Sequence, residues 1–104
     1  MIKIPKSICV NTGGQSTVQP TIDSFIEEVY ETLVDKLNLE RGNGRHPHFE
    51  RRVEKTYYTK DCETGGIYYL KYRDRVVAIV LETRTELNYV QYDFFLNIEG
   101  ILPP

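Results

Sequence analysis

The sequence predicts an α+β domain in which one long helix packs against a four-stranded antiparallel β-meander. The first half of the chain carries an apolar stripe with helical spacing, and the second half carries short segments rich in β-branched and tyrosine residues. Turn-forming residues separate those segments closely enough for hairpins. A chain of 104 residues, 40% of them hydrophobic, can bury a core of its own. We therefore expect residues 1–104 to form a single domain, with residues 100–104 as a flexible tail.

The chain begins with spaced branched residues, which predict an N-terminal strand from Ile2 to Val10. Pro5 interrupts this strand and removes one backbone donor, so the strand belongs at an edge of the sheet. A loop rich in glycine, serine and threonine is expected to follow, from Asn11 to Pro20. The pattern leaves open which strand of the meander the first strand joins.

A long amphipathic helix is predicted over Ile22–Leu39. Ser24 and Glu27 have the spacing of a capping box near its start. Gly42 and Gly44 are expected to end it. The apolar residues recur at offsets of three and four, which places them on one stripe: Ile22, Phe25, Ile26, Val29, Leu33, Val34 and Leu37.

The remainder of the chain is predicted to be almost entirely β-structure. Short turn segments separate four runs of strand-forming residues, which is typical of an antiparallel meander. The strands are expected at Val53–Lys60, Ile67–Arg73, Val76–Thr85 and Tyr89–Ile98.

This sheet has more apolar surface than one helix can cover. A helix is roughly 10 Å across, whereas four strands span roughly 15–20 Å, so one face is expected to stay uncovered. The covered face is assigned from the cleanest alternation, in the last strand, at Val90, Tyr92 and Phe94. The second face is then expected to expose Tyr69, Val76, Ala78, Val80, Tyr89 and Phe95.

An uncovered apolar face of this kind is typical of an interaction site. It predicts a partner-binding surface for another protein or for a second copy of the chain. The alternative is that the N-terminal strand and its loop fold back over this face. The residues predicted to bind the partner are Tyr69, Val76, Val80, Tyr89 and Phe95.

The charge of the chain is unevenly distributed. Residues 41–60 carry six Lys or Arg against two acids, although the whole chain has a net charge of −2. Guanidinium groups suit phosphates, so this segment predicts a site for nucleic acid or a phosphorylated small molecule. The alternative is that these charges only offset the acidic face of the helix. The predicted anion-binding residues are Arg41, Arg45, His46, His48, Arg51 and Arg52.

The chemical motifs give weaker indications. His46 and His48 could cleave a phosphodiester as a general acid and base, which makes a small ribonuclease a further alternative. Residues so close in sequence rarely flank a substrate from opposite sides, and no nucleotide-binding fingerprint or nucleophile elbow is present. We expect no catalytic residue, metal or cofactor.

The bulk features indicate the class of protein. The longest apolar run is too short to cross a bilayer, and the first residues lack the apolar core of an export signal. Cys9 and Cys62 stand far apart, which favours free thiols in a reducing compartment. The leading hypothesis is therefore a cytoplasmic, non-enzymatic protein that acts by docking on a protein partner, as an inhibitor, an immunity-type protein or an adaptor does.

Overall fold

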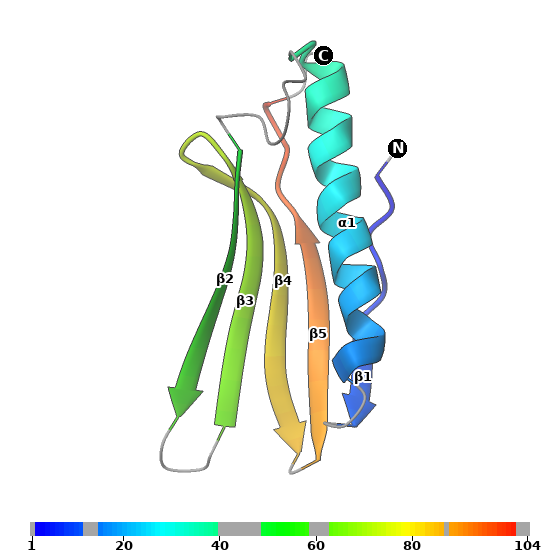
Figure 1. The fold of residues 1–104 in the computed structure, drawn as a ribbon, viewed down its shortest axis with the longest axis vertical. Helices are drawn as coiled ribbons and strands as arrows, with labels where there is room; N and C mark the ends of the chain where they lie inside the picture. Colours follow the sequence, from blue (N-terminus) through cyan, green and yellow to red (C-terminus); the bar gives the residue numbers. More distant parts are fainter. Residues whose placement is uncertain (1, 12–14, 40–48, 59–62, 87, 102–104) are drawn as a thin grey trace.

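The computed structural model describes residues 2–11, 15–39, 49–58, 63–86 and 88–101. One helix packs on a five-stranded antiparallel sheet with the order β1-β5-β4-β3-β2 (Figure 1), which confirms the predicted α+β class. The first strand joins the last one, so the meander gains a fifth strand. The elements are β1 (Ile8–Asn11), α1 (Gln15–Lys36), β2 (Phe49–Tyr58), β3 (Glu63–Tyr72), β4 (Arg75–Glu86) and β5 (Tyr89–Leu96).

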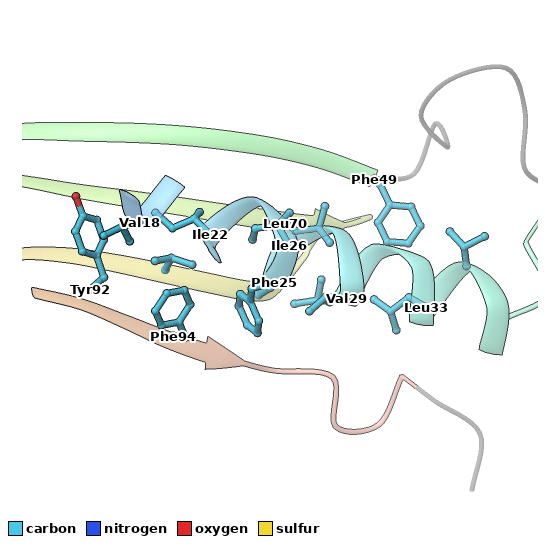
Figure 2. Close-up of a cluster of buried hydrophobic side chains, with 14 of the residues drawn as sticks. Val18, Ile22, Phe25, Ile26, Val29, Leu33, Phe49, Leu70, Tyr92 and Phe94 are labelled. Atoms are coloured by element: carbon cyan, nitrogen blue, oxygen red, sulfur yellow. The ribbon is translucent and has the colours of Figure 1, made fainter. Parts of the chain in front are cut away.

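The core lies between α1 and one face of the sheet (Figure 2). The ring of Phe25 on α1 meets the ring of Phe94 on β5 edge-on, with the centroids 5.5 Å apart. This packing, rather than intrinsic propensity, is what stabilises a helix of this kind. Leu37 of the predicted stripe follows the last residue of the helix and is half-buried, and Val18 extends the stripe towards the N-terminus. The buried residues that the helix contributes are Val18, Ile22, Phe25, Ile26, Val29, Leu33 and Val34.

The helix begins and ends earlier than predicted. It starts at Gln15 and contains Pro20, a residue of the predicted loop over Asn11–Pro20. Val18 continues the apolar stripe one turn before Ile22 and is buried, and that burial offsets the backbone donor that the proline lacks. Ser24 and Glu27 therefore lie inside the helix and cannot form a capping box at its start.

Asn38, rather than a glycine, ends the helix. Its φ of 53° is left-handed, and its N–H donates to the carbonyl of Asp35 at 3.2 Å. The N–H of Leu39 donates to the carbonyl of Val34 at 3.0 Å. These two bonds make a Schellman motif, in which asparagine is the usual substitute for glycine. Gly42 and Gly44 lie outside the described residues.

The predicted bounds of several strands are also corrected. β1 is confined to Ile8–Asn11, because the segment before it runs along the helix, where the N–H of Lys3 donates to the Glu28 carboxylate at 3.3 Å. β2 begins at Phe49 rather than Val53, since Phe49 is buried and pairs with Tyr72. Ile101, in the predicted tail, is half-buried against the core.

The assignment of the two faces of β4 was wrong. Ala78 and Val80, expected on the uncovered face, are fully buried beneath the helix. Register shifts at both ends of β4 accompany this orientation: the one between Leu70 and Lys71 sets Tyr69 opposite Ile79 instead of Ala78, and the one between Arg84 and Glu86 sets Val90 opposite Arg84 instead of Thr85. A shift of one residue moves every side chain of a strand to the other face.

A pair of substitutions in β3 tests this orientation. Leu70 is fully buried, whereas Ile67 on the same strand is 37% exposed. Leu70→Ala should lower the free energy of unfolding by about 2–5 kcal/mol through lost burial and a new cavity. Ile67→Ala should cost less than about 1 kcal/mol, because it leaves no cavity. Urea unfolding of both variants measures the difference, and equal losses would contradict the orientation.

Candidate protein-interaction surface

The sheet face turned away from α1, here called the open face, carries two apolar rows in register. In the first row Tyr69 pairs with Ile79, and Ile79 pairs with Phe95. In the second row Ile67 pairs with Leu81. Directly opposed side chains on neighbouring strands lie close enough to touch, so the two rows form one continuous surface. We call these five residues the open-face patch: Ile67, Tyr69, Ile79, Leu81 and Phe95.

The open-face patch is partly exposed to solvent in the described structure. Phe95 is 50% exposed, and Tyr89, further along β5 on the same face, is 43% exposed. Tyr69, Ile79 and Leu81 are half-buried. Exposed large apolar side chains are unremarkable when scattered, but a contiguous group marks an interaction surface.

Polar residues border the patch on β5 and β1. The Nε2 of Gln91 donates to both carboxylate oxygens of Asp93, at 3.2 and 2.9 Å. Cys9 pairs with Gln91 from β1 and is an exposed free thiol. An apolar centre with a polar, hydrogen-bonded rim is the usual anatomy of a protein-binding surface.

The structure places three of the five predicted partner-binding residues on the open face, namely Tyr69, Tyr89 and Phe95. Val80 does not lie there, because it is buried under the helix. Val76 is half-buried at the far end of β4, where it pairs with Lys71 beside a register shift.

Three residues of the open-face patch, Ile67, Ile79 and Leu81, were not among the predicted partner-binding residues. Glu82 lies on the same face of β4 as Ala78 and Val80, and a charged residue at such a position usually indicates a solvent-exposed face. Glu82 is in fact only 4% exposed.

Glu82 can be buried because one neighbouring residue donates a hydrogen bond to its carboxylate and another leaves room for it. The hydroxyl of Tyr92 on β5 donates to its Oε2 at 2.9 Å. On the other side, Gly66 of β3 pairs with Glu82, and a Cβ at that position would lie 3.4 Å from Oε1. Glycine thus leaves room for the carboxylate, and the hydrogen bond makes its burial tolerable.

The two tyrosines beside Glu82 are held in their neutral form. Burial is the main cause that raises the pKa of Tyr92, followed by the hydrogen bond to Glu82. Burial also raises the pKa of Tyr68, with the charges of Glu82 and Asp23 adding to the effect. These phenols therefore keep their protons at neutral pH, and the Tyr92 hydroxyl stays a hydrogen-bond donor to Glu82.

Of the predicted anion-binding residues, only Arg51 has a described side chain. Its guanidinium forms an ion pair with the Glu27 carboxylate of α1 and lies 5.6 Å from the centroid of the Tyr30 ring. Arg51 therefore offsets the acidic helix face, as the alternative interpretation expected. Arg41, Arg45, His46 and His48 lie outside the described residues, and nothing is described of the Arg52 side chain.

A second surface feature is a cleft of about 260 Å³ between α1 and the strands β2 and β3. Its lining is about equally polar and apolar, and Val53 at its edge is 57% exposed. The cleft is lined by Gln19, Ile22, Asp23, Ile26, Arg51, Val53, Tyr68 and Tyr69. This cleft is small for a ligand site, since such sites usually measure roughly 300–1,000 Å³.

In comparisons with known proteins, no family model, curated protein or solved structure matches the chain. Within the described ranges, no three His, Cys, Asp or Glu side chains come together to hold a metal ion. The described helix is not long and apolar enough to span a bilayer.

The contact between Tyr92 and Glu82 predicts a specific response to alkaline pH. The pKa of Tyr92 is raised above its ordinary value of 10.0 in the folded chain. Below pH 10 the folded and the unfolded chain both keep the Tyr92 proton, so the contact contributes fully to the free energy of unfolding. Above pH 10 the unfolded chain loses the proton first, so the free energy of unfolding falls as the pH rises. Tyr92→Phe should weaken this alkaline loss.

The same substitution should cost about 1–3 kcal/mol at neutral pH, because the buried Glu82 carboxylate loses a donor. Tyr89→Phe is the matched control, since Tyr89 is exposed. Its replacement should change neither the free energy of unfolding at neutral pH nor the loss of that free energy at alkaline pH. Urea unfolding at neutral and alkaline pH measures both effects. Identical behaviour of the two variants would show that the Tyr92–Glu82 contact does not stabilise the fold.

Proposed function

We propose that the chain is a small, non-enzymatic protein-binding module that docks on another protein through its open face. The observation that carries this proposal is the open-face patch, in which five apolar side chains adjoin on the face opposite the only described helix. Inhibitors, immunity-type proteins and adaptors work in this way, by covering a surface of their partner.

The physical basis is the apolar area that docking would remove from water. Full burial of a large apolar side chain contributes about 1.5–3 kcal/mol, so Phe95, which is half exposed, would contribute roughly half of that. Aromatic side chains in the centre of an interface usually provide much of its affinity. A partner of matching chemistry has a flat apolar surface.

Two ionisable groups of the described structure have partners within the chain. Arg51 is paired with Glu27, and the Glu82 carboxylate accepts a hydrogen bond from Tyr92. These contacts favour a binding role over catalysis. The free thiol of Cys9 suits the reducing cytoplasm, which is where we place the module.

The test of this proposal is affinity capture from the cytosol of the source cells with wild-type chain and two variants. Phe95→Ser removes the most exposed side chain of the open-face patch. Ile4→Ser is the matched control, because Ile4 is 48% exposed but lies outside the sheet.

The proposal expects a partner that the wild type and Ile4→Ser retain equally and that Phe95→Ser binds about tenfold more weakly. Surface plasmon resonance with the purified partner would measure that ratio. Unchanged affinity of Phe95→Ser, or no specific partner for the wild type, would overturn the proposal.

A further inference from the structure

The strand β4 contains one extra residue near its turn with β3. Next to that turn Lys71 pairs with Val76, and the following pair joins Leu70 to Ala78. Val77 is therefore the extra residue of a β-bulge, and both it and Ala78 are fully buried although they are consecutive. The bulge displaces the rest of β4 by one residue along β3, so it decides which face of β4 lies beneath the helix. We call this pairing the bulged register.

The central part of β4 is apolar on both faces, so its own pattern does not decide between them. The face beneath the helix carries Ala78, Val80 and the carboxylate of Glu82, all of them buried. The open face carries the larger Ile79 and Leu81, which are half-buried. Hydrophobic burial alone would favour the opposite orientation, because it would cover the larger side chains and return the charge to water.

A slip of β4 by one residue towards its turn with β5 would produce that opposite orientation. Val77 would leave the bulge and enter the strand opposite Leu70, so the pairing set by the first turn would continue without interruption. At the other end Arg84 would pair with Tyr89, and the extra residue would pass into the turn. Hairpin loops of about four residues, which this would create, are common. The strands β3 and β5 would keep their places, and we call this pairing the slipped register.

The space beneath the helix suits one of the residues that the slip would bring there. Glu82 now lies between Gly66 and Tyr92 of the neighbouring strands. Leu81 would take this place, and the glycine opposite it carries no side chain that competes for the room. The slip would thus replace a buried carboxylate by an apolar side chain of similar length.

We propose that β4 is a register switch, in which the hydrogen bond from Tyr92 to Glu82 favours the bulged register over the slipped one. The hydroxyl of Tyr92 donates to the Oε2 of Glu82 at 2.9 Å. In the slipped register Glu82 lies on the open face opposite Gln91, and the buried Tyr92 hydroxyl loses this acceptor. Two packings of one sequence can differ little in free energy, and a single buried hydrogen bond then decides which of them dominates.

The slip changes the surface that a partner would meet. Ile79 and Leu81 leave the open-face patch, and Ala78 and Val80 take their places. A partner that covers Ile79 and Leu81 binds the bulged register alone, so its binding shifts the equilibrium towards that register. This regulatory role rests on the proposed docking function, whereas the slip itself is a property of the isolated chain.

Two lysine substitutions at consecutive positions test the switch without any partner. Ala78→Lys sets a charge beneath the helix in the bulged register and on the open face in the slipped one, so this variant should fold in the slipped register. Ile79→Lys is the matched control and should fold in the bulged register. The double variant Ala78→Lys/Ile79→Lys buries a lysine in either register and should be unfolded.

Nuclear Overhauser contacts between backbone protons of β3 and β4 report the register directly. The wild type and Ile79→Lys should connect residue 79 with Tyr69, as in the bulged register. Ala78→Lys should connect residue 79 with Tyr68 instead. An Ala78→Lys variant that is unfolded or keeps residue 79 opposite Tyr69 would overturn the switch, as would a folded double variant. Either result would leave the docking function untouched, because no partner takes part.

The role of the Tyr92 hydroxyl is tested by Tyr92→Phe, with Tyr89→Phe as the control at an exposed site. Saturation-transfer NMR on the amides of residues 78–84 measures the population of a minor state. Tyr92→Phe should raise this population about tenfold or more over the wild type, and Tyr89→Phe should leave it unchanged. Adding Ile79→Lys to Tyr92→Phe should abolish the minor state. A population that Tyr92→Phe does not raise, or that Ile79→Lys does not abolish, would contradict the proposal.

Discussion

One helix can cover only one face of this sheet, and the rest of the structure follows from that constraint. A helix is roughly 10 Å across, whereas strands repeat every roughly 4.8 Å, so five strands extend beyond the helix on one face and are left uncovered on the other. Figure 1 shows α1 on a single side of the sheet. The core shown in Figure 2 fills the space between the helix and the sheet. Other apolar residues, such as Phe95 and Val53, lie outside it and are exposed.

The apolar surface outside the core is arranged in an orderly way. On the open face it follows two cross-strand rows through Ile79 and Leu81, and at the sheet edge it is concentrated at Val53. Beside the second row, the side-chain amide of Gln91 donates a hydrogen bond to the Asp93 carboxylate. Such an arrangement is typical of surfaces that meet another chain, because it combines desolvation with a defined orientation.

Much of the fold could be predicted from the sequence, because the spacing of apolar residues within a short segment already distinguishes a helix from a strand. The stripe through Ile22, Val29 and Leu33 specified the helix, and the strict alternation of Val90, Tyr92 and Phe94 specified the covered face of β5. The orientation of β4 could not be predicted in this way. It depends on one-residue register shifts in the pairing of β4 with both of its neighbours, and on a buried carboxylate whose partners, Tyr92 and Gly66, lie on other strands.

The most direct test of the uncovered face is oxidative footprinting of the isolated chain, with mass spectrometry of adjacent aromatic residues. Phe95 and Tyr89 are exposed, whereas Phe94 and Tyr92 are buried beneath the helix. We expect hydroxyl radicals to modify Phe95 and Tyr89 much faster than their two buried neighbours. Equal protection of all four rings would show that another part of the chain covers the open face and would contradict the account.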